Sequence, residues 1–203
     1  MLFVSLHSMV SHNKIIYTIG HSTRSAEEFI HLLLSFNIKL LADIRSYPGS
    51  KRYPHFNKET LQQMLPAHHI IYQHFPDLGG RRKALKNSKN IAWKNEAFRG
   101  YADYMETDSF KEAIILLEGD AVQHLTAYMC SEAVWWRCHR SMVSDYLKWK
   151  GWQVFHIMGP NTMQEHPYTA PAHIINGVLI YTKEAKQNNC FRIKSISNGS
   201  FVI

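Results

Sequence analysis

The sequence has little cysteine, no long apolar run and no nucleotide-binding fingerprint, and each absence excludes a class of protein. Its three cysteines, Cys130, Cys138 and Cys190, are too few for a disulfide scaffold, so we expect a reduced, cytoplasmic protein. No run of about 18 apolar residues occurs, which excludes a spanning helix and predicts no membrane partner. Neither G-x-G-x-x-G nor G-x-x-x-x-G-K-[ST] is present, and we expect no bound cofactor.

The composition is that of an ordinary globular protein with an excess of positive charge. The 203 residues are 45% hydrophobic and 19% charged, which fits one domain and argues against disorder. Lysine and arginine number 23 against 16 acidic residues, so the formal charge is +7. Residues 79 to 99 hold seven basic residues and one acidic residue, and the rest is close to neutral. This imbalance predicts an anionic partner, either a small molecule or a nucleic acid.

The two ends of the chain differ from its middle. Residues 1–13 have neither a basic n-region nor a small-residue cleavage pattern, so we expect a ragged N-terminus, with Met9 as an alternative start, rather than a signal peptide. We predict a single α/β domain over residues 14–181 and a C-terminal tail over residues 182–203. No pattern in the sequence predicts an oligomeric state.

Hydrophobic patterns predict strands that alternate with helices. Short β-branched and apolar runs predict five strands, at 14–21, 39–44, 70–75, 125–129 and 153–157. Helical spacing predicts helices at about 26–36, after Asn57, from Ser109 to Gly119 and at about 139–150. Capping boxes are expected at the start of the first, from Ser25 and Glu28, and of the third, from Ser109 and Glu112. The alternation is typical of βαβ units. We therefore expect an α/β fold with a mostly parallel sheet of about five strands covered by helices.

Two further segments carry signals of their own. Asn176-Gly177 between apolar flanks predicts a C-terminal β-hairpin within 173–181, and Asn198-Gly199 predicts a second turn. The basic stretch from Gly79 to about Tyr101 has no clear periodicity and is long for a loop without a function. Its cations are mixed with aromatic residues, namely Trp93, Phe98, Tyr101 and Tyr104. These fit either a lid that contributes charge or a surface that stacks bases while it tracks phosphates.

Polar and reactive residues follow the predicted strands at their carboxyl ends, where open parallel sheets bind ligands. The candidates are His21, Ser22, Thr23, Arg24, Asp43, Arg45, Arg81, Arg82, Cys130, Glu132, Cys138, His139 and Arg140. The sequence therefore predicts a site at this edge of the sheet.

Several of these residues have both a chemical and a structural interpretation. His21 at a strand exit fits a general base, an anion donor or a metal ligand, but also a loop histidine bonded to backbone. Asp43 and Arg45 share one side of an extended strand, so Asp43 can orient a histidine or substrate hydroxyl, or form a structural ion pair. Glu132 just past a buried strand needs a partner, which favours a role in the site.

The segment from Cys130 to Ser141 combines thiols, imidazole and a predicted helix start. A helix that begins near Arg140 places free N–H groups beside Cys138, where they bind anions and lower the pKa of a thiol. The alternative is that both cysteines are small buried hydrophobes. Thiolate and imidazole ligands for zinc or iron are available in principle from Cys130, Cys138, His139 and His21. However, the C-x7-C-H spacing is unlike that of structural zinc sites, and we therefore predict no metal.

Five motifs in order give the chain a strong resemblance to the family catalogued as domain of unknown function 488. They are YTIGHSTRSAEEF at 17–29, DIRSYPGSKRYPHFN at 43–57, LGGRR at 78–82, FRGYADYM at 98–105 and CSEAVWWRCHRS at 130–141. The resemblance implies that the motif residues are functional, and it adds Tyr101 to the candidates. The chain departs from the family pattern at Ser131, where Ala is common, and at Ala133-Val134, where Asp-Pro is common.

We expect an enzyme, a hydrolase or group transferase, that acts on a phosphate-bearing or otherwise anionic substrate such as a nucleotide or nucleic acid. The expected catalytic residues are His21, Asp43, Cys130, Glu132, Cys138 and His139. The expected substrate-binding residues are Ser22, Thr23, Arg24, Arg45, Arg81, Arg82, Tyr101 and Arg140. The alternatives are a nucleic-acid-binding module that uses the basic loop 79–104, and a Cys/His metal or redox site.

Overall fold

The computed structural model describes residues 14–183. The predicted ragged N-terminus 1–13, with its alternative start at Met9, lies outside the described residues. So do the predicted turn at Asn198-Gly199 and, apart from its first two residues, the predicted tail 182–203. Cys190 lies outside them as well.

A six-stranded sheet forms the centre of the fold. Its strands are β1 (Ile15–Gly20), β2 (Leu40–Asp43), β3 (Ile71–His74), β4 (Thr126–Cys130), β5 (Gln153–Gly159) and β6 (Thr162–Glu165). They lie in the order β3-β2-β4-β1-β5-β6; the first five are parallel, and β6 is antiparallel to β5. The predicted mostly parallel α/β sheet is confirmed. The sequence did not predict β6, because all four of its residues are exposed and give no apolar pattern.

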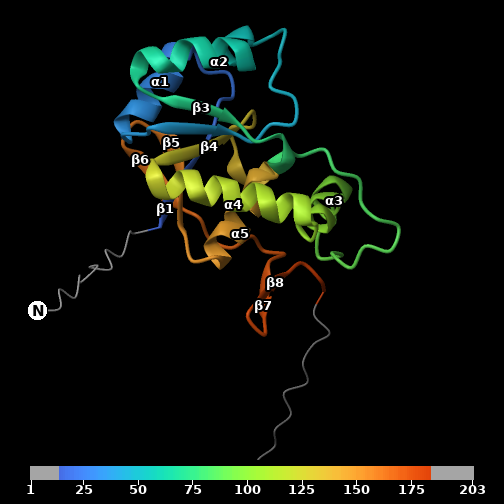
Figure 1. Ribbon diagram of the computed structural model, residues 1–203. Helices are drawn as coiled ribbons and strands as arrows, with labels where there is room; N and C mark the ends of the chain where they lie inside the picture. The colour runs from blue at the N-terminus through green and yellow to red at the C-terminus, as the bar shows by residue number, and fades with distance from the viewer. Residues whose placement is uncertain (1–13, 184–203) are drawn as a thin grey trace, which may run out of the picture.

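Helices cover both faces of this sheet. They are α1 (Ala26–Ser35), α2 (Lys58–Met64), α3 (Glu96–Met105), α4 (Asp108–Gln123) and α5 (Arg140–Trp149). Figure 1 shows α1 and α2 on one face and α4 and α5 on the other. The order of strands explains this division. The chain moves outward from β1 to β3 and then returns, and right-handed crossovers in opposite directions place their helices on opposite faces.

Two predictions about helices were wrong in detail. The predicted capping box at Ser109 and Glu112 is replaced by Thr107, whose hydroxyl accepts from the backbone N–H of Phe110. The helix also continues through Gly119 instead of ending there, since an interior glycine costs only about 1 kcal/mol. In addition, the basic stretch is not entirely a loop, because α3 begins at Glu96 within it.

Two hydrophobic cores fill the spaces between the layers. Phe29 and Leu33 of α1 pack in one, and Phe110 of α4 and Leu147 of α5 pack in the other. None of the helices in residues 14–183 has the length and apolar character that a membrane span requires.

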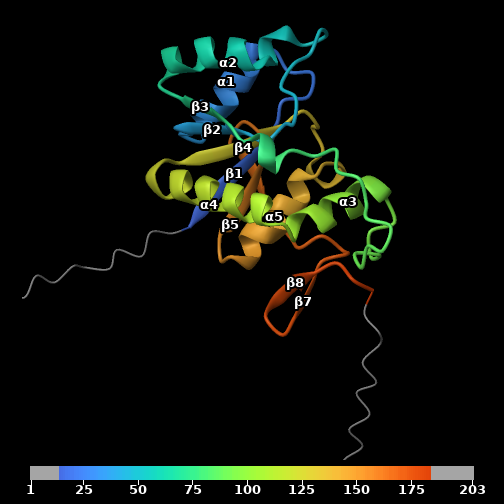
Figure 2. The ribbon, with the colours of Figure 1, turned by 45° about the vertical axis from the view of Figure 1, so that its right-hand side comes forward.

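The predicted C-terminal hairpin is confirmed. It consists of β7 (His173–Ile175) and β8 (Val178–Ile180), joined at Asn176 and Gly177, which have φ of 51° and 78°. Positive φ at both positions is what a tight hairpin turn requires. Figure 2 shows the hairpin beyond α5, away from the carboxyl ends of the parallel strands.

Candidate functional site

The loop after β4 leaves the sheet differently from its neighbours. The chain leaves β1 and β2 toward the face of α1 and α2, but it leaves β4, which lies between them, toward α5 on the opposite face. Such a divergence opens a crevice at the carboxyl ends of the strands. The backbone N–H of His21 donates to the carbonyl of Cys130 at 3.0 Å and ties the two diverging loops together. A side chain at Gly20 would collide with the carbonyl oxygen of Glu132, so this close approach requires glycine.

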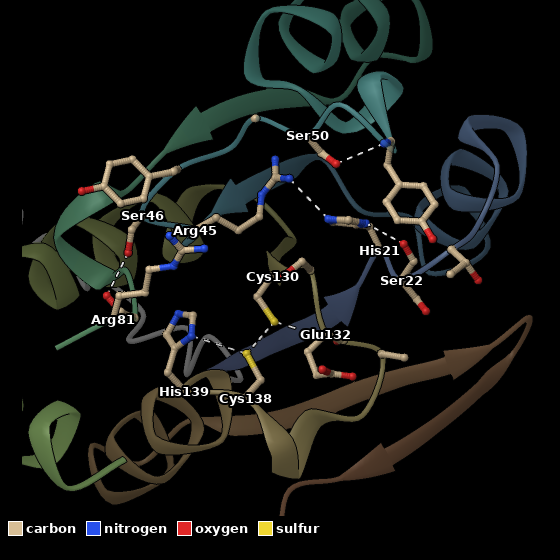
Figure 3. A pocket seen from close by; sticks show the side chains of 17 residues that line it. His21, Ser22, Arg45, Ser46, Ser50, Arg81, Cys130, Glu132, Cys138 and His139 are labelled. Atoms are coloured by element: carbon tan, nitrogen blue, oxygen red, sulfur yellow. Dashed lines mark hydrogen bonds between the residues drawn. The ribbon is translucent and has the colours of Figure 1, made fainter. Parts of the chain in front are cut away.

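A cavity of about 490 Å³ occupies this crevice. Nine of the predicted site residues line it: His21, Ser22, Thr23, Arg45, Arg81, Cys130, Glu132, Cys138 and His139. Figure 3 shows their side chains around a common space, with the two sulfur atoms between the arginines and Glu132.

Other lining residues were not among the expected catalytic and substrate-binding residues. They are Ser46, Tyr47, Gly49, Ser50, Tyr53, Gly80, Ser131 and Ala133. Most come from the loop after β2 or adjoin a candidate. The sequence feature that pointed to the residues of this loop was the family motif DIRSYPGSKRYPHFN at 43–57.

Four predicted binding residues do not line the cavity, namely Arg24, Arg82, Tyr101 and Arg140, and the first three support the scaffold. The guanidinium of Arg24 donates to the carbonyl of Gly20. That of Arg82 lies 3.5 Å from the ring centroid of Tyr104 in a cation–π contact. The buried hydroxyl of Tyr101 donates to the carbonyl of Leu78 at 2.7 Å.

Arg45 is held from behind by a buried carboxylate. Its Nε and Nη2 donate to the two oxygens of Asp43, which also accepts from the hydroxyl of Tyr72 at 2.7 Å. Nη2 donates as well to the carbonyl of Phe56, and Nη1 lies 3.3 Å from Nε2 of His21. Asp43 therefore fixes and neutralises Arg45, and it reaches His21 only through that guanidinium.

His21 is a neutral imidazole with both nitrogens engaged. Burial, and then the charge of Arg45, lower the pKa of His21 to about 4. Because arginine can only donate, Nε2 accepts from Arg45 and the ring proton lies on Nδ1, which donates to the carbonyl of Ser22 at 3.0 Å. The ring also stacks on Phe56, with centroids 4.2 Å apart. This arrangement positions Arg45 and leaves His21 no free lone pair for base catalysis.

The two described cysteines differ in their electrostatic environment. Their sulfur atoms lie 2.6 Å apart, and neither is part of a disulfide. Burial raises the pKa of the Cys130 thiol well above its usual value, and the neighbouring Cys138 raises it further. Burial also acts to raise the pKa of Cys138, but the hydrogen bond from Cys130, the charge of Arg140 and the backbone N–H of Arg140 outweigh it and lower that pKa. Cys138 is therefore the more acidic thiol of the pair and the one that ionises first.

The imidazole of His139 faces the sulfur of Cys138. Its Nε2 lies 3.1 Å from the carbonyl oxygen of Ile44, which can only accept, so the ring proton lies on Nε2. Nδ1 then presents its lone pair 3.4 Å from Sγ of Cys138. Burial is the largest cause that lowers the pKa of His139. The neutral ring can take the thiol proton when Cys138 ionises.

Arg140 supplies positive charge beneath the thiols. Its side chain is 2% exposed, and its Nη2 donates to the carbonyls of Glu132 and Ala133. Within residues 14–183 no carboxylate pairs with it, and its buried Nε has no hydrogen-bond partner. Because the first turn of α5 also begins here, the predicted positive helix end beside Cys138 is present.

Glu132 lies at the predicted site, but the expectation that its carboxylate is buried was wrong. Its side chain is exposed at the mouth of the cavity, so there is no buried charge in need of a partner. The backbone carbonyl of Glu132, rather than its carboxylate, makes the contacts with Cys130 and Arg140. The carboxylate is left free to meet a ligand.

The aromatic side chains of the basic stretch pack on the protein. Trp93 and Phe98 stack with centroids 4.8 Å apart and lie against the core, and Tyr101 is buried. The lysines of the stretch are exposed, namely Lys83, Lys86, Lys89 and Lys94. This surface offers charge but little aromatic area.

In the part of the chain that the structure describes, no group of three or more His, Cys, Asp or Glu side chains is placed to hold a metal ion.

Comparison with known proteins identifies the family. No curated protein and no solved structure matches the chain. Residues 25–147, which include α1 to α4 and the loop with both thiols, match the family described as domain of unknown function DUF488. The match covers more than half of the sequence, and the chain therefore belongs to the DUF488 family.

Proposed function

We propose that this protein is an enzyme, a hydrolase or group transferase, in which Cys138 attacks a phosphate-bearing or otherwise anionic substrate. One observation carries the proposal. Cys138, the more acidic of the two thiols, lies in the same cavity as Arg45 and Arg81. A nucleophile beside anion-binding groups is the arrangement that phosphoryl or acyl transfer to a thiol needs.

Cys138 is equipped as a nucleophile. In the first step its sulfur forms a bond to the electrophilic phosphorus or carbonyl carbon, and the bond to the leaving group breaks. The leaving group departs with that electron pair and takes a proton from solvent water. Water in a hydrolase, or an acceptor hydroxyl in a transferase, then displaces the sulfur and restores the thiolate.

Arg81 supplies the net charge that attracts the substrate. The charge of Arg45 is offset by Asp43, whereas Arg81 is exposed and forms no ion pair within residues 14–183. Arg81 also has a φ of 62°, and Ser22 at the other side of the cavity has a φ of 53°. Non-glycine residues adopt this conformation at a cost, and such residues concentrate at ligand sites.

Two alkylating reagents of the same size test the site without a known substrate. Iodoacetate carries a negative charge, and iodoacetamide does not. We expect Cys138 to react with iodoacetate faster, relative to its reaction with iodoacetamide, than a thiol in a small peptide does. Inorganic phosphate should slow both reactions, and Arg81→Gln should reduce the preference for iodoacetate by about tenfold.

The matched control for Arg81→Gln is Lys39→Gln. Lys39 is exposed beside the amino end of β2, so its substitution removes one positive charge at the opposite edge of the sheet. It should leave the preference unchanged. A Cys138 that reacts no faster with iodoacetate than a peptide thiol does, or that responds equally to both substitutions, would contradict the proposal.

A second candidate is the binding of a nucleic acid by the basic stretch. Four exposed lysines, Lys83, Lys86, Lys89 and Lys94, favour it, since they follow Arg81 and can neutralise successive phosphates. The packed aromatic side chains do not favour base stacking. If this surface is the main function, affinity for nucleic acid falls steeply with salt and does not change in Cys138→Ser.

A further inference from the structure

In the reaction proposed above, Cys130 only donates a hydrogen bond that lowers the pKa of Cys138, and its own sulfur forms no covalent bond. Both sulfur atoms line the cavity, so a small oxidant that reaches one also meets the other. Cys130 ends β4, and Cys138 lies two residues before the start of α5, at the end of the intervening loop. The two elements that carry the thiols are thus held together by the fold itself.

We propose that Cys130 is a resolving thiol, which converts oxidised Cys138 into a reversible intramolecular disulfide. The oxidant is a hydroperoxide. This inference needs the reactive thiolate of the proposed function, but not its substrate.

The chemistry is balanced in three steps. The thiolate of Cys138 attacks one peroxide oxygen, the O–O bond breaks, and Cys138 becomes a sulfenic acid while hydroxide or alkoxide leaves. The sulfur of Cys130 then attacks the sulfur of Cys138, the S–O bond breaks, and the hydroxyl leaves as water with the proton of the Cys130 thiol. Two equivalents of an external thiol finally reduce the disulfide and are themselves oxidised to a disulfide.

The charges around the pair favour this order of events. Arg140 stabilises the thiolate of Cys138, and that thiolate in turn keeps Cys130 protonated, because a second adjacent negative charge would be repelled. Oxidation of Cys138 to a neutral sulfenic acid removes that repulsion. The positive charge of Arg140 then favours ionisation of Cys130, which is the form that attacks.

The resolving step would protect the nucleophile. A sulfenic acid without a partner thiol is oxidised further to sulfinic and sulfonic acids, which are not reduced by thiols. A disulfide between Cys130 and Cys138 stops at the reversible stage. Oxidation should therefore switch Cys138 off without destroying it.

The test uses the full chain with Cys190→Ser, which leaves Cys130 and Cys138 as its only cysteines. After treatment with hydrogen peroxide, we expect both thiols to disappear and the mass to fall by two hydrogen atoms. Trypsin cleaves after Arg137, between the two cysteines, so the disulfide should appear as a linked pair of peptides. Dithiothreitol should restore both thiols and the alkylation of Cys138.

Two further variants separate the roles of the thiols. With Cys130→Ser added, oxidised Cys138 should be trapped by dimedone, a sulfenic-acid reagent, and in the absence of dimedone it should gain two or three oxygen atoms irreversibly. With Cys138→Ser added instead, Cys130 should remain an unmodified thiol. Irreversible oxidation of Cys138 while Cys130 is present, or the same products with and without Cys130, would overturn the inference.

The outcomes also distinguish this inference from the proposed function. A disulfide that forms in a protein without any preference for iodoacetate supports Cys130 as the resolving thiol and refutes only the anionic substrate. A preference for iodoacetate without a disulfide refutes only the inference.

Discussion

Gly80 packs directly against the imidazole ring of His139. A Cβ atom at position 80 would lie 2.9 Å from Nδ1 of that ring, closer than real side chains approach. The glycine therefore holds open the space in which Nδ1 faces the sulfur of Cys138.

Gly80→Ala should slow the reaction of Cys138 with iodoacetamide by about tenfold, because the displaced imidazole loses its hydrogen bond to the thiol. The rate at pH 7 measures this directly. Gly119→Ala is the control, since a Cβ there meets nothing within 4 Å and the helix gains stability by about 1 kcal/mol. Equal rates in the two variants would show that His139 does not activate the thiol.

Asp43→Asn should destabilise the fold by roughly 3 kcal/mol, because it leaves the buried guanidinium of Arg45 without its countercharge. Tyr72→Phe removes only one hydrogen bond to the same carboxylate and should cost about 1 kcal/mol. Urea denaturation measures both. A loss for Asp43→Asn no larger than that for Tyr72→Phe would contradict the view that Asp43 neutralises Arg45.

His21 should make the protein less stable in acid. Its pKa is about 4 in the folded chain and 6.5 when unperturbed, so the unfolded chain binds the proton more tightly between these values. The stability due to neutral His21 is complete above pH 6.5 and is lost as the pH falls toward 4, by up to about 3 kcal/mol. Urea denaturation at pH 4.5 and 7 should show a smaller difference for His21→Gln than for the parent protein. An equal or larger difference would contradict this account.

Replacement of Lys83, Lys86, Lys89 and Lys94 by Gln should weaken any binding of single-stranded DNA. It should also reduce the slope of log affinity against log salt by about 0.7 for each lysine that contacts a phosphate. Fluorescence anisotropy at several salt concentrations measures the slope. An unchanged slope would remove the second candidate function.

The sequence predicted the parallel sheet and the edge at which the cavity lies, because short apolar strands and helix caps are local signals. Ser25 and Glu28 form the expected capping box, and Asn176 and Gly177 form the expected turn. The exposed strand β6 has no such signal. Helix α3 was not predicted because Arg99, Gly100 and Asp103 interrupt its apolar pattern. Trp93, which precedes the helix, packs on Phe98 within it, and this contact has no signal in the local pattern.

The identity of the site residues was easier to predict than their roles. Their place after parallel strands follows from chain order, whereas the partner of each side chain depends on rotamers and distant backbone. No pattern in the sequence shows that Arg45 occupies a nitrogen of His21, or that the carbonyl of Ile44 fixes the tautomer of His139. The contact between Cys130 and Cys138 likewise depends on the path of the whole loop.

The central claim is that Cys138 is an ionised nucleophile, and the pH dependence of its alkylation tests this claim most directly. Iodoacetamide labelling of the Cys190→Ser protein from pH 5 to 10, resolved by peptide, gives the midpoint for each thiol. The structure predicts that Cys138 reacts first, with a midpoint below the usual thiol pKa of about 8.5, while Cys130 stays unlabelled. A midpoint for Cys138 at or above that value, or labelling of Cys130 first, would contradict the account.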